Sequence, residues 1–207
     1  MATRIVKEPE IRKQEILDTA MKLFNTKGFE ATSIADIARE MSVVPSLCYK
    51  YFSSKQEIFV VATNQFANKM AIPIIELIKN RELTFQQRLN MIGLFMLQEE
   101  KEETKEDNQY HEYYHTAGNE VFHFQVSYIM MNIISPIISE ELSYLHSSGE
   151  IPENDYDLLA DFIVYGLTSI VLDFKKISYV KKKEKVETAL KYVYKLLQID
   201  EPNDLHL

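Results

Sequence analysis

The sequence has one cysteine, five glycines and six prolines among its 207 residues. The single cysteine, Cys48, excludes a disulfide framework and a zinc site built from cysteines. Strands need turn residues to bound them, and glycine and proline are too scarce here to supply many turns. Because 46% of the chain is apolar, a proper core can form. We therefore expect an all-α fold.

No segment has the pattern of a signal peptide or a membrane span. The N-terminal residues lack a basic region followed by an apolar run. The two most apolar windows, 121–138 and 158–174, are interrupted by polar residues such as His123, Asn132 and Asp161. About 20 consecutive apolar residues are needed to cross a bilayer. A cytoplasmic protein without membrane contact is expected.

Acidic residues exceed basic ones, but the excess is unevenly distributed. The net charge is −8, and a large negative charge argues against a nucleic-acid partner. Residues 1–55, however, hold nine Lys/Arg and seven Asp/Glu, whereas the remainder holds fourteen and twenty-four. The mildly basic N-terminal segment can contact DNA even though the rest of the chain is acidic.

Residues 111–118, HEYYHTAG, contain the H-E-x-x-H arrangement of many zinc proteases. In a helix, His111 and His115 would share one face, with Glu112 beside them as general base. The extended motif needs a third histidine where this chain has Val121, and no substrate-binding strand accompanies it. Two alternatives stay open at this point: a metal-responsive regulator that uses His111 and His115, and a zinc hydrolase.

Apolar periodicity predicts two short helices with a tight turn between them near the N-terminus. Helices are expected over 9–27, 33–41 and 45–52, followed by a long helix from 54 to about 80, kinked near Pro73. Ser33 and Ser54 each have an acidic residue three positions later, which is the spacing of a capping box. This arrangement predicts a helix-turn-helix.

The remainder of the chain is also predicted to be helical. The expected segments are 84–98, 109–147 with a kink at Pro136, 156–175 and 184–197. The acidic run at 99–108 is interpreted as a solvated loop.

Residues 16–59 resemble the DNA-binding domain of TetR-type (tetracycline-repressor-like) bacterial regulators. The blocks that carry the resemblance are A-x-x-L-F-x-x-x-G-F, T-S-I-A-D-I-A and Y-K-Y-F-x-S-K-x-E. In the turn, the family usually has Gly-Val-Ser, whereas this chain has Ser42-Val43-Val44, so a slightly different turn geometry is expected. Cys48 stands where leucine is common and is expected to be a small buried residue.

The resemblance implies a DNA-binding domain over residues 8–55, with a connecting helix to about 80, and an effector-binding and dimerisation domain over 81–200. It implies a ligand-responsive transcriptional regulator rather than an enzyme, most often a repressor released from a palindromic DNA operator by a small molecule. The second short helix would enter the major groove. No cofactor or bound metal is expected. The side chains expected at the DNA are Ser33, Pro45, Ser46, Tyr49, Lys50, Tyr51 and Lys55.

Methionines and aromatic residues with embedded polar side chains indicate a pocket for an apolar or amphipathic effector. A buried polar side chain needs a partner, and a ligand can supply it. The expected pocket residues are Phe95, Tyr110, Tyr114, Phe122, His123, Asn132 and Tyr165.

The segment 158–174 is apolar nearly all round, so a helix there must be covered on more than one side. A second subunit in a two-fold homodimer is expected to supply that cover. The residues expected at the interface are Leu159, Phe162, Ile163, Leu167, Ile170, Leu190, Val193 and Leu197.

Overall fold

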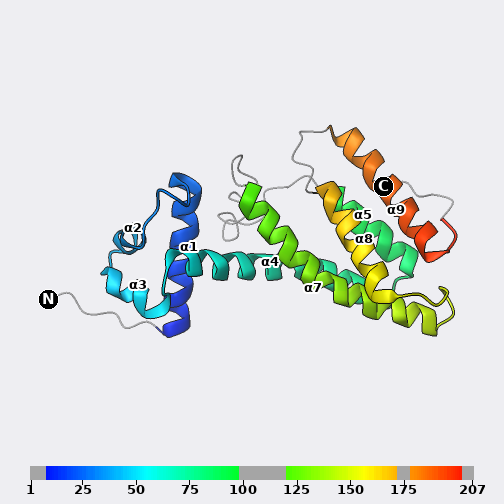
Figure 1. Ribbon diagram of the computed structural model, residues 1–207, viewed down its shortest axis with the longest axis horizontal. Coiled ribbons are helices and arrows are strands. Elements are labelled where there is room, and N and C mark those ends of the chain that lie inside the picture. Colours follow the sequence, from blue (N-terminus) through cyan, green and yellow to red (C-terminus); the bar gives the residue numbers. More distant parts are fainter. Residues whose placement is uncertain (1–7, 98–119, 172–177, 202–207) are drawn as a thin grey trace. The chain divides into compact units, whose positions relative to one another are not determined.

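The computed structural model describes residues 8–97, 120–171 and 178–201, and these residues form helices and loops without strands (Figure 1). This confirms the all-α prediction. The helices are α1 (Pro9–Lys27), α2 (Ile34–Glu40), α3 (Pro45–Tyr51), α4 (Lys55–Lys79), α5 (Phe85–Leu97), α7 (Glu120–Ser147), α8 (Tyr156–Val171) and α9 (Tyr179–Leu197).

The contacts divide the chain into two units, and two helices contribute to both. The first unit holds α1 to α3, α4 as far as Phe66 and the beginning of α7 as far as His123. The second unit holds the rest of α4, α5, the rest of α7, α8 and α9. The domain limits expected from the sequence, 8–55 and 81–200, stay a prediction.

An aromatic cluster holds α1, α4 and the beginning of α7 together in the first unit. The Phe24 ring lies 5.1 Å from that of Phe29 and 5.9 Å from that of Phe59. Phe122 then packs on Phe59 and stacks on Phe66, with centroids 5.7 and 5.9 Å apart. Rings at these separations stabilise a core beyond the area they bury.

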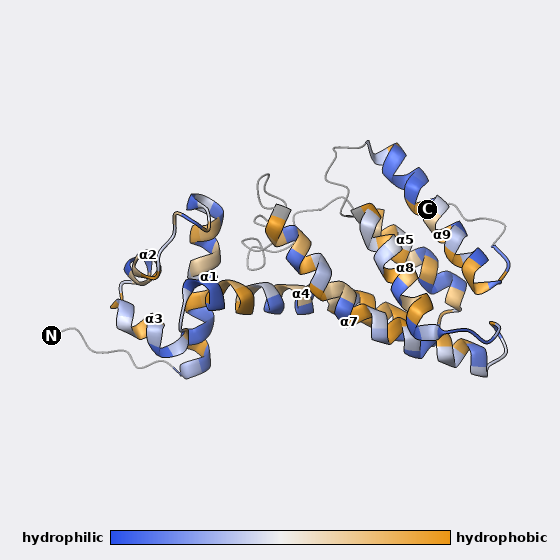
Figure 2. Ribbon diagram, viewed as in Figure 1, coloured by the Kyte–Doolittle hydropathy of each residue, from blue (hydrophilic) through white to orange (hydrophobic). Residues whose placement is uncertain are grey.

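The core of the second unit is aliphatic. Apolar residues recur along α9 at helical spacing, so one stripe faces α5 and α8 while lysines cover the other side. In Figure 2, α9 is mostly blue at its beginning and carries orange in its later turns. The buried residues include Leu89 and Leu97 of α5, Leu142 and Leu145 of α7, Leu159, Ala160 and Ile163 of α8, and Val186, Leu190, Val193, Tyr194 and Leu197 of α9.

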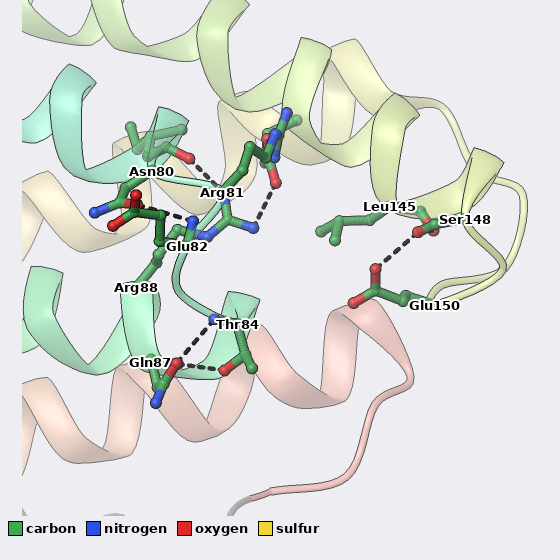
Figure 3. Close-up of polar contacts among 11 residues, drawn as sticks. Asn80, Arg81, Glu82, Thr84, Gln87, Arg88, Leu145, Ser148 and Glu150 are labelled. Atoms are coloured by element: carbon green, nitrogen blue, oxygen red, sulfur yellow. Dashed lines mark hydrogen bonds and ion pairs between the residues drawn. The ribbon is translucent and has the colours of Figure 1, made fainter.

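Side chains close to each other in sequence build the turn between α4 and α5 (Figure 3). The Asn80 Oδ1 accepts from the backbone N–H of Glu82 at 3.0 Å. Thr84 and Gln87 form a reciprocal cap, in which the N–H of Thr84 donates to Gln87 Oε1 and the N–H of Gln87 donates to Thr84 Oγ1. The cap satisfies donors that the first turn of α5 would otherwise leave unpaired.

A buried carboxylate joins this turn to α7. Glu141 is only 3% exposed and pairs with both Arg81 and Arg88; the Arg88 Nη2 lies 2.7 Å from Glu141 Oε1. Arg88 also donates through Nη1 to the carbonyl oxygen of Ile78 at the end of α4. The Arg81 guanidinium lies over the ring of Tyr144, 3.9 Å from its centroid. The end of α4, the start of α5 and α7 are thereby fixed to one another.

The predicted limits at 98, 109 and 175 lie outside the described residues. The other helix boundaries agree with the predicted ones to within one residue, except at α9. Its predicted start was residue 184, whereas α9 begins at Tyr179. The lysines at 181–183 favour helix, and the Ser178 hydroxyl caps it by accepting from the N–H of Lys181. Pro73 and Pro136 both lie inside continuous helices.

By length and composition alone, α4 and α7 are long and apolar enough to cross a bilayer. Their apolar residues instead contribute to the cores described above, for example Phe59 and Phe66 of α4 and Leu142 and Leu145 of α7. Amphipathic helices of this kind are ordinary in a globular protein.

Candidate nucleic-acid interface

The turn between α2 and α3 is built around Ser42. The Ser42 N–H donates to the Arg39 carbonyl at 3.0 Å, and the Val43 N–H donates to the Ala38 carbonyl at 2.8 Å, which is the bonding pattern of a Schellman motif. Ser42 has φ 55°, the left-handed conformation that usually favours glycine. The serine thus adopts the conformation that this motif requires, and the expected difference from the family's Gly-Val-Ser turn stays a prediction.

The second short helix, α3, is anchored by one residue and exposes the opposite face. Cys48 is fully buried, and burial raises the pKa of its thiol, so the residue acts as a small core side chain, as expected. Pro45, Ser46, Tyr49 and Lys50 are all exposed. These are four of the side chains predicted at the DNA, and they lie on one short helix.

Lys50 and Lys55, both predicted at the DNA, have different surroundings. Lys50 is exposed, and its ammonium lies 5.8 Å from the ring centroid of Tyr51; no carboxylate pairs with it among the residues that the structure describes. Lys55 instead donates to the Phe29 carbonyl at 2.6 Å and lies 4.3 Å from the Phe29 ring centroid. Lys50 thus offers an unpaired positive charge, whereas the ammonium of Lys55 already binds the loop after α1.

Ser33 caps α2. Its hydroxyl accepts from the Asp36 N–H at 3.1 Å, and Asp36 Oδ2 accepts from both the N–H and the hydroxyl of Ser33. These hydrogen bonds lower the pKa of the Asp36 carboxyl, so a negative charge is held at this helix end. The predicted capping box is confirmed, while the predicted DNA contact of Ser33 stays a prediction.

Val44 was not among the side chains predicted at the DNA, yet it directly precedes α3 and is 64% exposed. It is the N-cap residue of α3 but makes no side-chain cap. An apolar residue at a position that favours Ser, Thr, Asp or Asn is the signal that identifies it.

The residues predicted for the effector pocket fall into separate places. Phe122 and His123 are buried in the first unit, where desolvation lowers the pKa of His123 to about 4. Phe95 is partly exposed on α5 in the second unit. Tyr110 and Tyr114 lie outside the described residues.

Asn132 and Tyr165 line one small cavity of about 220 Å³ between α7 and α8. Its walls are polar, because Ser135 donates to Asp161 and Ser139 donates to Asp157 at 2.5 Å. The Asn132 amide donates to the Tyr128 carbonyl at 2.7 Å. Only these two of the predicted pocket residues are brought together by the described part of the second unit.

The predicted dimer residues lie in different surroundings in the second unit, and their contact with a second subunit stays a prediction. Leu159, Ile163, Leu190, Val193 and Leu197 are buried in the core, whereas Phe162 is exposed. Periodicity in a helix that is apolar nearly all round does not distinguish core from interface. A groove of about 640 Å³ between α8 and α9 is lined by Phe162, Ile163, Leu167, Ile170 and Val193 of the prediction, together with Gly166, Ala189, Tyr192 and Leu196.

His111, Glu112 and His115 lie outside the described residues. Within the described ranges, no group of three His, Cys, Asp or Glu side chains is placed to hold a metal ion.

Residues 16–62 match the family model described as "Bacterial regulatory proteins, tetR family". The matched segment contains α2, α3 and the turn at Ser42. This segment is therefore assigned to the TetR-type DNA-binding domain.

Relatives and solved structures agree with this TetR-type assignment. The chain is 39% identical over 57 residues to the HTH-type transcriptional regulator HbdR of Aromatoleum sp. (strain CIB), covering 26% of this chain and 25% of HbdR. It is 28% identical over 67 residues to the HTH-type transcriptional repressor BdcR of Escherichia coli (strain K12), covering 32% of this chain and 34% of BdcR. The match thus spans about a quarter to a third of these curated relatives.

The fold is shared over nearly the whole chain. A TetR-family transcriptional regulator from Mesorhizobium loti MAFF303099 superposes with a TM-score of 0.64 over 92% of this chain and 98% of that one, at 15% identity. These matches are to regulators, and they give no support to the zinc hydrolase or to the metal-responsive alternative.

Proposed function

We propose that this TetR-type chain is a cytoplasmic, ligand-responsive transcriptional repressor that binds a palindromic operator through α3 and is released by a small molecule. The observation that carries the proposal is the exposed face of α3. It presents Pro45, Ser46 and Tyr49 together with the unpaired ammonium of Lys50. A recognition helix in the major groove needs side chains for base edges and a cation for phosphate, and this face has both.

Binding of the full-length chain to DNA selected from a random duplex pool tests the proposal. We expect enrichment of a palindrome whose half-sites lie one helical turn or a multiple of it apart. Lys50→Ala should weaken binding to every sequence, because a phosphate contact carries no sequence information. A pool without any enriched sequence, or unchanged binding by the Lys50 variant, would contradict the proposal.

The operator would be bound by a homodimer formed through α8 and α9. The groove between these helices is bordered by large apolar side chains that the protomer leaves in water; Phe162 is 65% exposed and Tyr192 is 60% exposed. Leu158 and Leu196 extend this exposed apolar surface on the same two helices. A contiguous exposed apolar patch marks an interaction surface, and a two-fold partner would bury it against its own copy.

The oligomeric state of Phe162→Glu tests the dimer. A buried unpaired carboxylate is costly, so this variant should sediment as a monomer and lose operator affinity. Ile72→Glu is the matched control, because Ile72 is also a half-exposed apolar residue but lies on α4. A dimeric Phe162→Glu protein would show that the interface is elsewhere.

The effector is proposed to be amphipathic. The cavity at Asn132 and Tyr165 offers amide, hydroxyl and carboxylate groups, and Met131 lines it on the apolar side. Its volume of about 220 Å³ suits the polar end of a ligand. Drug-sized ligands occupy clefts of roughly 300–1,000 Å³, so the apolar part would extend beyond it.

A screen of amphipathic compounds by thermal shift, followed by release of operator DNA, tests this assignment. Compounds that raise the melting temperature should also dissociate the complex, because a ligand acts only through its different affinities for two states. Tyr165→Phe should weaken both effects, whereas Tyr192→Phe on α9 should leave them unchanged. Release that is equally strong in both variants would place the effector elsewhere.

A further inference from the structure

Lys50 is the only side chain of α3 and its flanking turns of a kind that can read a base with two hydrogen bonds. Residues 41–54, MSVVPSLCYKYFSS, contain no Arg, Asn, Gln, Asp or Glu. In the major groove, guanine accepts two hydrogen bonds from Arg or Lys, adenine pairs in the same way with Asn or Gln, and cytosine donates to a carboxylate. Lys50 is the side chain proposed for phosphate. Base recognition by the other residues of α3 must therefore rest on other contacts.

Apolar and hydroxyl groups are what the exposed side of α3 presents instead. Val44 is 64% exposed, and Pro45 follows it at the first helical position. Ser46 and Tyr49 add hydroxyl groups, which donate to or accept from any base and so discriminate weakly. The aliphatic side chains of Val44 and Pro45 have the narrower preference, since they favour apolar contacts.

Val44 is unusual among the helix starts of the helix-turn-helix unit. The corresponding residues of α2 and α4 are serines, and the hydroxyls of Ser33 and Ser54 accept from the N–H groups of Asp36 and Glu57 at 3.1 Å. Val44 provides no such hydrogen bond and leaves two methyl groups in water. A contact that removes these methyl groups from water would offset both the missing capping hydrogen bond and the exposure of the apolar side chain.

Only one base offers an apolar group in the major groove, and that base is thymine, through its 5-methyl group. We propose that Val44 and Pro45 read thymine methyl groups, so that the bases under α3 are specified by methyl contact rather than by paired hydrogen bonds. The inference rests on the proposed function, since it requires α3 to enter the major groove. It implies A·T pairs in each half-site where Val44 docks.

Replacing thymine by uracil tests the inference, because uracil lacks the methyl group and keeps every hydrogen-bonding atom. The probe is the duplex enriched by the full-length chain, with uracil placed at one thymine position of both half-sites at a time. Burial of one methyl group contributes about fourfold in affinity. We expect at least one position at which the two substitutions together weaken binding by roughly fifteenfold, while uracil in the flanks has no effect.

The Val44→Ser variant tests whether Val44 makes the contact with the thymine methyl group. The serine removes both methyl groups and supplies a capping hydroxyl, so α3 should fold at least as well, which a thermal melt checks. At the position that Val44 contacts, this variant should bind the thymine and uracil duplexes equally, whereas a position that Pro45 contacts should keep its preference for thymine. Val60→Ser is the control, because Val60 is another half-exposed valine, on α4; it should keep the preference for thymine.

Two results would overturn the inference while leaving the proposed function intact. One is an enriched duplex that binds equally with thymine or uracil at every half-site position. The other is a thymine preference that Val44→Ser leaves unchanged at every position. Failure of the wild-type chain to enrich any DNA is a different result, and it would overturn the proposed function and the inference together.

Discussion

The two units of the chain use polar side chains in different ways. In the first unit, helix ends are capped at the surface by residues three or four positions apart, as in Ser33 with Asp36 and Ser53 with Glu57. The second unit has such caps too, as in Thr84 with Gln87, but it also buries Glu141 between Arg81 and Arg88, and the two partners in the Arg81 contact are 60 residues apart. The capping carboxylates of the first unit thus stay at the surface, whereas the Glu141 carboxylate fixes helices of the second unit to one another.

Removing the buried carboxylate should have the largest effect. Glu141→Gln leaves Arg88, only 5% exposed, without its counter-charge. Breaking a buried pair from one side costs about 3–5 kcal/mol in the free energy of unfolding, measurable by urea denaturation. The neighbouring Glu140→Gln is the control, because the exposed Glu140 lies 3.9 Å from Lys79 and should contribute less than about 1 kcal/mol. Equal stability of Glu141→Gln and Glu140→Gln would contradict the role given to Glu141 in fixing the helices of the second unit.

His123 of the first unit is a titratable residue that is only 8% exposed. Burial lowers its pKa to about 4, below the ordinary 6.5 that it regains on unfolding. The unfolded chain therefore binds more protons between these values, so stability should fall as the pH drops from 6.5 towards 4. We expect a loss of about 1–2 kcal/mol, allowing for water at the edge of the ring. The stability of His123→Gln should lose this part of its pH dependence. If the variant keeps the stability-against-pH curve of the wild type, His123 is not the source of the loss.

Lys55 and Lys50, both in the first unit, should respond differently to the same substitution. Lys55→Met should lower stability by about 1 kcal/mol, because it removes a charged hydrogen bond to the Phe29 carbonyl and a contact with the Phe29 ring. Lys50→Met should leave the melting temperature unchanged, since Lys50 is exposed and unpaired within the described residues. Comparable losses in both variants would show that the two lysines are alike.

The same helix-terminating motif occurs in both units and should respond in the same way. Ser42 and Gln198 are non-glycine residues with φ 55° and 56°, whereas Gly149 occupies the equivalent place after α7 with φ 81°. Glycine adopts this conformation without steric strain, so Ser42→Gly and Gln198→Gly should each stabilise by about 0.5–1 kcal/mol. Gly149→Ala should cost a similar amount. Lower melting temperatures for both Ser42→Gly and Gln198→Gly would refute the assignment of a left-handed helix-terminating residue at these two positions.

The first unit could be predicted from sequence because its signals are local. The predicted helix 9–27 coincides with α1, and the Ser33 capping box is present. The contacts of Glu141 could not be predicted, because no local pattern joins residues 53 to 60 positions apart. Burial could not be predicted for a related reason: in α8, periodicity marked Leu159 and Phe162 alike, yet Leu159 is buried and Phe162 is exposed.

The salt dependence of operator binding by the wild type and by Lys50→Ala tests the central claim most directly. Each phosphate contact contributes about 0.9 to the slope of log affinity against log salt, so a dimer with two Lys50 contacts should lose about 2 from that slope. Lys191→Ala, which removes an exposed lysine of α9, should leave the slope unchanged. A slope that is identical in the wild type and in Lys50→Ala would contradict the account of α3 as the DNA-binding helix.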